Sequence, residues 1–183
     1  MHIEYIEVKE KKLHYEMFNT VVEGFNNTII DDISINMDFK IMRIFFHTNL
    51  VSNSDYKCDG EMYESSIFGD GKTEIIMKNL QVEIVISFEI IKNDQCKDIM
   101  NLKSLLYGAD AVDGVHYKVG NLFNGNEALS VAANKLMNMT WRTVVANYGR
   151  YFTDKIIEKI FEAVKVFMRS RPLEDLAIYT DTQ

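Results

Sequence analysis

The 183-residue chain is poor in proline and cysteine, the residue types that interrupt long elements and cross-link folds. It contains one proline, Pro172, and two cysteines, Cys58 and Cys96. An average composition would supply about nine prolines, so long helices and strands can run here almost without interruption. No Cys-x-x-Cys pair occurs and no histidine stands at metal-ligand spacing, which argues against a zinc site. The two cysteines form either one disulfide or two free thiols.

Blocks of positive charge and long apolar runs are also missing. The chain has 20 Lys and Arg against 27 Asp and Glu, a net charge of −7, and its basic residues form no cluster. This distribution argues against binding to nucleic acid or to anionic lipid surfaces. No window approaches 18 apolar residues, and the N-terminus lacks the apolar core of a signal peptide. We therefore expect a soluble protein without stable membrane insertion, whose secretion signal, if any, is not in this chain.

Catalytic motifs are missing as well. The chain has no Gly-x-Ser-x-Gly or His-Glu-x-x-His motif, and its four histidines are scattered. Gly71-Lys72-Thr73 resembles the end of a phosphate loop, but Ser66 replaces the first glycine and a strand follows. A hairpin turn is the better interpretation. We expect no enzyme, no catalytic residue, no metal and no cofactor, although a nucleophile and a base brought together by the fold would escape this test.

The composition is that of a folded protein, and the first part of the chain has the pattern of strands. Hydrophobic residues make up 47% of the chain and charged residues 26%. From residue 12 to residue 91 apolar and polar residues alternate, most strictly from Leu80 to Ile90. Asn53-Ser54-Asp55, Asp59-Gly60 and Gly69-Asp70-Gly71 are typical of turns between these strands. Residues 92–120 have no clear pattern.

The last part of the chain has the pattern of a long helix. Residues 127–170 contain no proline, and their apolar residues recur at three- and four-residue spacing. The pattern predicts a helix of about 65 Å, or two with a bend near Gly149, ended before Pro172. An antiparallel sheet with one apolar face has to curl around such a helix. A filled groove would make the protein a scaffold, whereas a hollow one would leave an apolar tunnel for a lipid-like ligand.

Three separated segments resemble one known family. They are residues 120–129 (GNLFNGNEAL) followed by Asn134, Leu136, Asn138 and Trp141-Arg142; Asp55-Tyr56-Lys57 followed by Gly60, Ile67, residues 69–72 and Asn79; and residues 169–176 (RSRPLEDL). Together they resemble the takeout and juvenile-hormone-binding protein family of insects, over about residues 12–176. The usual N-terminal segment of that family, with its cysteine pair, has no counterpart here. Ser66 and Ser54 replace a usual proline and glycine.

The resemblance implies an α+β fold in which a strongly curved antiparallel sheet wraps a long C-terminal helix, as in tubular lipid-binding proteins. It further implies one domain over residues 1–183 and a secreted, non-catalytic carrier. The expected partner is a hydrophobic small molecule, such as a juvenile hormone-like terpenoid, a fatty acid or a related lipid, and a monomer is favoured. The alternative is a protein-interaction or signalling module of the same fold with a filled tunnel.

Ten residues are the candidate ligand contacts under this hypothesis, because they are apolar or aromatic and are expected to face inward. They are Phe39, Ile41, Tyr63, Ile84, Ile86, Phe88, Trp141, Val145, Tyr148 and Phe152. Each is equally suited to an ordinary core position. Tyr63 and Tyr148 are the best polar contacts, since tyrosine combines an apolar ring with a hydroxyl that can bind an epoxide, ester or acid. Two glycosylation triplets, at Asn26 and Asn138, add a weak indication of secretion.

Overall fold

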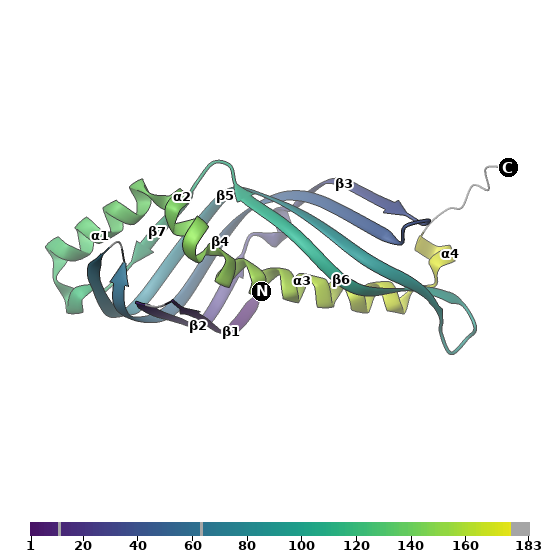
Figure 1. Cartoon of the computed structure of the whole chain (residues 1–183), viewed down its shortest axis with the longest axis horizontal. Coiled ribbons are helices and arrows are strands. Elements are labelled where there is room, and N and C mark those ends of the chain that lie inside the picture. The colour runs from purple at the N-terminus through teal and green to yellow at the C-terminus, as the bar shows by residue number, and fades with distance from the viewer. Residues whose placement is uncertain (11, 63, 177–183) are drawn as a thin grey trace. The chain divides into compact units, whose positions relative to one another are not determined.

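A computed structural model describes residues 1–10, 12–62 and 64–176, and in it the strands precede the helices (Figure 1). The strands are β1 (His2–Lys9), β2 (Leu13–Glu23), β3 (Ile29–Asn36), β4 (Ile41–Met62), β5 (Ser65–Lys92), β6 (Asp98–Ala111) and β7 (Val115–Val119). The helical segments are η1 (Phe25–Asn27), η2 (Phe123–Gly125), α1 (Glu127–Met139), α2 (Trp141–Val144), η3 (Val145–Gly149), α3 (Arg150–Ser170) and α4 (Leu173–Leu176). The predicted order of strands first and helix last is confirmed. The segment without a clear pattern forms β6 and β7.

The seven strands form one sheet in the order β1-β2-β4-β5-β6, in which β3 also pairs with β4 and β7 with β5. The pairs β1/β2, β2/β4 and β5/β7 are antiparallel. Alternating burial along β5 confirms the predicted period of two. The buried residues of that series are Leu80, Val82, Ile84, Ile86 and Phe88.

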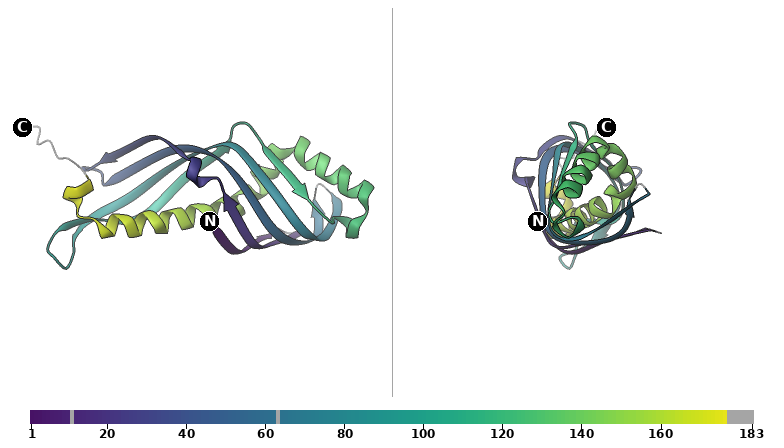
Figure 2. Two further views of the ribbon diagram at one scale, coloured as in Figure 1. Left: turned by 180° about the vertical axis from the view of Figure 1, so that it is seen from behind. Right: turned by 90° about the vertical axis from the view of Figure 1, so that its left-hand side faces the viewer.

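The chain folds into two compact units. The first unit comprises residues 1–29, 47–81 and 109–155. Its helical segments, drawn in green, lie on the concave side of its strands (Figure 2). Its core consists of residues from both layers: Leu13, Tyr56, Cys58, Ile67, Val119, Leu122, Met137 and Val144.

The second unit comprises residues 30–46 and 82–108 together with the described residues from 156 onward. Ile84, Ile86 and Phe88 of β5 are 1 to 4% exposed, and Met100 and Leu102 of β6 are 1% exposed. Strand β3, in contrast, is exposed along its whole length. This unit therefore has a well-buried core and one solvent-exposed strand.

The three predicted turns are wrong, because Asn53-Ser54-Asp55 and Asp59-Gly60 lie inside β4 and Gly69-Asp70-Gly71 lies inside β5. Gly60 belongs to β4 and has a φ of 134°, and a Cβ there would lie 2.1 Å from the carbonyl oxygen of Lys12. Gly69 belongs to β5, where a Cβ would lie 2.7 Å from the carbonyl oxygen of Asn121. Both glycines permit a close approach of another backbone rather than a reversal of the chain. Glu64, just before β5, has a φ of 62°.

The long helix is interrupted in two places. Helix α1 begins after Asn126, whose side chain accepts a hydrogen bond from the backbone N–H of Leu129, and ends at Met139. Thr140 separates α1 from α2, and a π-helical turn, η3, lies between α2 and α3. The π turn ends at Gly149, the residue near which the sequence allowed a bend between two helices. Pro172 follows the end of α3, as predicted.

A candidate ligand cavity

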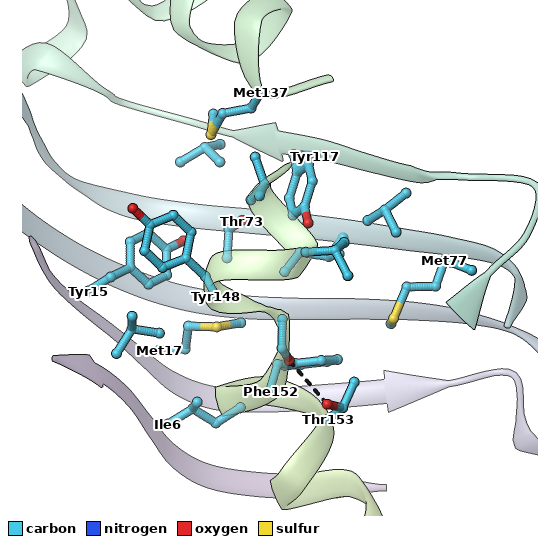
Figure 3. A pocket seen from close by; sticks show the side chains of 18 of the residues that line it. Ile6, Tyr15, Met17, Thr73, Met77, Tyr117, Met137, Tyr148, Phe152 and Thr153 are labelled. Carbon is cyan, nitrogen blue, oxygen red and sulfur yellow. Dashed lines mark hydrogen bonds between the residues drawn. The ribbon is translucent and has the colours of Figure 1, made fainter. Parts of the chain in front are cut away.

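The first unit contains an apolar cavity of about 130 Å³ between its strands and its helical segments (Figure 3). Strands β5 and β7 show how the sequence forms its wall. Their register pairs Thr73 with Val119, Ile75 with Tyr117 and Met77 with Val115. All six side chains line the cavity, because residues two apart on a strand point to the same face. The other lining residues are Ile6, Val8, Leu13, Tyr15, Met17, Met62, Leu80, Ala109, Ala111, Met137, Val144, Val145, Tyr148, Gly149, Phe152 and Thr153.

Four methionines line the cavity: Met17, Met62, Met77 and Met137. They come from β2, β4, β5 and α1, so they face the cavity from several sides. Methionine is unbranched and has several rotatable bonds, so it fills irregular gaps and repacks at low cost. The wall of the cavity can therefore adjust to groups of different shape.

The π-helical turn η3 supplies the helical side of the wall. Val145, Tyr148 and Gly149 of this turn line the cavity, and the hydroxyl of Thr153 donates a hydrogen bond to the carbonyl oxygen of Gly149 (3.2 Å; Figure 3). A Cβ at Gly149 would lie 3.1 Å from Cγ1 of Val145. The turn thus places Gly149, which has no side chain, in the cavity wall. Such π turns are frequent at functional sites.

The polar groups of the cavity are neutral. Among the described residues that line it there is no Lys, Arg, His, Asp or Glu. The ring of Tyr15 stacks on that of Tyr56, with centroids 5.4 Å apart, and burial raises the pKa of the Tyr15 hydroxyl. Tyr15 is consequently protonated at neutral pH. Figure 3 places the hydroxyl of Tyr15 near Thr73 and that of Tyr117 toward the cavity.

Two asparagines of α1 hold this helix to the outer edge of β7. Asn138 accepts from the backbone N–H of Tyr117 (2.7 Å) and donates to its carbonyl oxygen (2.8 Å). Asn134 does the same to Val119, at 2.8 and 2.9 Å. Each amide also donates to the carbonyl oxygen four residues before it in the helix. The four-residue spacing of the asparagines thus matches the two-residue spacing of the strand, and it fixes Met137 against the cavity.

The loop before α1 joins two of the segments that resemble the family, residues 120–129 and residues 69–72, in space. Asn121, Phe123 and Asn124 have φ values of 57°, 54° and 52°, a conformation that asparagine tolerates better than most residues. The side chain of Asn121 donates to the carbonyl oxygen of Asp70 (2.7 Å), and Leu122 between these residues is fully buried. Residues 120–125 therefore pack against the strand that contains Gly69-Asp70-Gly71.

The ten predicted contacts fall in different places. Val145, Tyr148 and Phe152 line the cavity. Trp141 is half-buried in α2, where the guanidinium of Arg142 lies 4.3 Å from its ring centroid. Ile84, Ile86 and Phe88 belong to the core of the second unit, and Tyr63 lies outside the described residues.

Phe39 and Ile41 do not face inward as expected. Phe39 is 76% exposed in the turn between β3 and β4, and Ile41 is 40% exposed at the start of β4. The alternation that included them therefore did not continue through the turn. Ligand contact at any of the ten residues stays a prediction.

Sequence reasoning missed several lining residues, including Tyr15, Thr73, Met77 and Tyr117. For Tyr15 a signal existed, since it lies on the same face of a predicted strand as Leu13 and Met17. Thr73 was hidden by the preceding glycines, which favoured a turn. Only the strand pairing reveals that Thr73 and Tyr117 face the same space.

The model of one protein family, described as haemolymph juvenile hormone binding protein, matches residues 1–178. The chain belongs to this family. The predicted membership is thus confirmed, and the match begins before the expected residue 12. Family membership identifies a carrier of hydrophobic ligands in general, and the family is one of binding proteins.

A crystal structure of Epiphyas postvittana Takeout 1 shares the fold. Its TM-score to this chain is 0.92 at 23% sequence identity, with 96% of this chain and 81% of that chain covered. The predicted α+β fold, an antiparallel curled sheet with a long C-terminal helix, is confirmed. A comparison with curated proteins gives no match.

The described residues contain no group of three or more His, Cys, Asp or Glu side chains placed to hold a metal ion. None of their helices is both long and apolar enough to cross a membrane.

Proposed function

We propose that this protein is a secreted, monomeric carrier that binds a hydrophobic small molecule in the cavity of the first unit. Candidate ligands are a juvenile hormone-like terpenoid, a fatty acid or a related lipid. The observation that carries the proposal is the apolar cavity itself, lined from six strands and four helical segments and flanked by four methionines. The family description supports a ligand of this class and a haemolymph location.

The size of the cavity defines what it holds without rearrangement. Its volume of about 130 Å³ is close to that of an engineered apolar cavity of about 150 Å³ in another protein that binds benzene. A ring or a branched end group therefore fits directly, and a longer ligand requires the methionines to move. Burying about 200 Å² of apolar ligand surface contributes about 5 kcal/mol before ordering costs are subtracted.

The test is displacement of a fluorescent apolar probe, together with mass spectrometry of lipid extracted from the purified protein. Ala111 lines the cavity and is 3% exposed, so Ala111→Phe should fill it and lower probe affinity at least about tenfold. Ala132→Phe, at an exposed position of α1, is the matched control and should bind as the parent does. Absence of extractable lipid and of displaceable binding in the parent protein contradicts the proposal.

A second candidate function is association with a protein, favoured by the apolar surface of β3. Ile30 and Ile33 in the middle of this strand are 52 and 56% exposed, an unusual density of aliphatic surface on one strand. Analytical ultracentrifugation decides between the two functions. A stable dimer that binds no apolar probe supports association, and a monomer that binds the probe supports the carrier.

A further inference from the structure

Helix α1 has the reverse of the usual polarity of a surface helix. The polar side chains of Asn134 and Asn138 bind the backbone of β7, on the side of the helix that faces the protein. Eight residues of α1 are exposed, and six of these eight are apolar. A helix on the surface of a soluble protein normally turns its polar residues to the solvent and its apolar residues to the core. The exposed side of α1 therefore calls for an apolar partner.

The large exposed side chains of α1 share one side of the helix, which lies beside β7 (Figure 1). Leu129, Val131, Leu136 and Met139 are 50, 62, 47 and 72% exposed. At about 100° per residue they fall within about half of the circumference of the helix, opposite Asn134. These four side chains form the apolar face of α1.

The size and shape of the apolar face limit what can cover it. Its four side chains together expose about 450 Å², roughly half of the 800 Å² that each partner contributes to a stable protein interface. A helix of 13 residues is a convex ridge about 20 Å long, whereas sites for small molecules are concave. None of the four side chains lines the cavity. Neither a second copy of this chain nor a small molecule therefore matches this face.

The charges of α1 favour an uncharged partner. The only charged residues of the helix are Glu127 and Lys135, whose charges cancel, and the whole protein carries a net charge of −7. Helices that lie on anionic membranes present several Lys or Arg residues, which α1 does not. A convex, apolar and neutral ridge matches the surface of a bilayer with uncharged headgroups, into which such helices insert to a depth of about 5 to 10 Å.

We propose that the apolar face of α1 docks reversibly on the surface of an uncharged lipid bilayer. Docking goes beyond the proposed function, because it gives the protein a surface for taking up or releasing its ligand at a membrane. Met137, on the opposite side of α1, lines the cavity. The bilayer then lies about one helix diameter, about 10 Å, from the cavity. An apolar ligand crosses little water over that distance.

The test is flotation of the full chain with phosphatidylcholine vesicles, and with vesicles in which phosphatidylserine replaces part of this lipid. The parent protein should float with the neutral vesicles and, at low salt, bind the anionic ones less tightly. Val131→Gln combined with Met139→Gln removes the two most exposed side chains of the face and should weaken binding to neutral vesicles at least about tenfold. The matched control is Leu106→Gln combined with Val166→Gln, at positions of the second unit that are 77 and 67% exposed. This control should float as the parent does.

Thermal unfolding is measured on the same samples. Val131→Gln and Met139→Gln lie at exposed positions, and glutamine is well tolerated in helices, so the double variant should unfold near the temperature of the parent. Leu129→Trp keeps the test decisive if it does not, because tryptophan favours membrane interfaces and should strengthen vesicle binding several-fold.

Three results would overturn the proposal. They are a parent protein that does not float with neutral vesicles, an equal loss of binding in the double variant and its control, and unchanged binding in Leu129→Trp. A parent dimer in analytical ultracentrifugation that Val131→Gln/Met139→Gln abolishes would also overturn it, and would assign the face to a second copy of the chain. Probe displacement in solution without vesicles tests the carrier function separately, so either proposal can fail while the other stands.

Discussion

The two units of this protein differ at one buried polar side chain each, Asn101 in the second unit and Thr73 in the first. In the second unit Asn101, 6% exposed, accepts hydrogen bonds from Nε and Nη2 of Arg169 at 2.9 and 2.6 Å. Its own amide donates to Glu89 (2.7 Å), which also binds Lys103 (2.9 Å). In the first unit Thr73 faces a cavity with its hydroxyl unpartnered. The contrast is what the proposed function predicts, with stability supplied by the second unit and ligand binding by the first.

The largest effect on stability is expected from the two asparagines of α1, because they satisfy backbone N–H and C=O groups of β7 in the first unit. Replacing Asn134 and Asn138 together by alanine leaves two N–H and two C=O groups of β7 unpaired. We expect the free energy of unfolding to fall by about 3 to 5 kcal/mol, with weaker probe binding because Met137 is no longer held in place. Denaturant titration measures the change, and Lys135→Ala on the exposed face of α1 is the control.

A loss below about 1 kcal/mol in that double variant would mean that water replaces the amides. The packing of α1 on β7 would then depend on apolar contacts alone.

Asn101 gives the next largest effect and tests the role of the second unit. Asn101→Ala leaves Arg169 without its acceptor and Glu89 without one donor, so unfolding should become easier by about 1 to 3 kcal/mol. Probe affinity should stay unchanged, since Asn101 does not line the cavity. Denaturant titration and probe displacement on the same preparation check both parts. A parallel loss of affinity would break the proposed separation between stability and binding.

The smallest effect concerns alkaline pH. Burial, with a smaller contribution from Asp59 and Asp70, raises the pKa of the Cys58 thiol from 9.0 to about 12. Above pH 9 the unfolded chain therefore loses this proton while the folded chain keeps it. Stability is full below that pH and decreases as the pH rises, by about 1 kcal/mol between pH 9 and 10.

Unfolding curves of the parent and of Cys58→Ala at these two pH values measure that contribution. The variant should lose less stability than the parent over the interval. Cys96→Ala, at an exposed thiol, should behave as the parent does. A parent without the alkaline loss would show that Cys58 is already accessible to solvent.

Both thiols are free in the structure, so at neutral pH a thiol reagent should react quickly with Cys96 and slowly with Cys58.

The sequence predicts the strands and the long helix well, because both depend on the period of apolar residues. The turns at Gly60 and Gly69 were predicted wrongly, since a glycine that permits a close backbone approach looks the same in sequence as one that permits a turn. The helical lining residues Val145, Tyr148 and Phe152 were found from their shared helix face.

The strand side of the cavity was harder to predict. Alternation marks two faces of each strand, but only pairing across the sheet tells which side chains meet. Thr73 and Tyr117 are 44 positions apart in the sequence and become near neighbours through the pairing of β5 with β7. Nothing local to either residue reports this pairing.

The asparagine pair on α1 also bears on glycosylation. Asn138-Met139-Thr140 is an acceptor triplet, but the nitrogen that would carry a sugar donates to the carbonyl oxygens of Tyr117 and Asn134, and the threonine hydroxyl donates to Leu136. Oligosaccharide transfer and docking of the helix thus compete for one nitrogen atom. Asn26, exposed in η1, has no such conflict. In a secretory cell a folded molecule would therefore carry its glycan at Asn26, and a molecule modified at Asn138 would be one whose first unit had not closed.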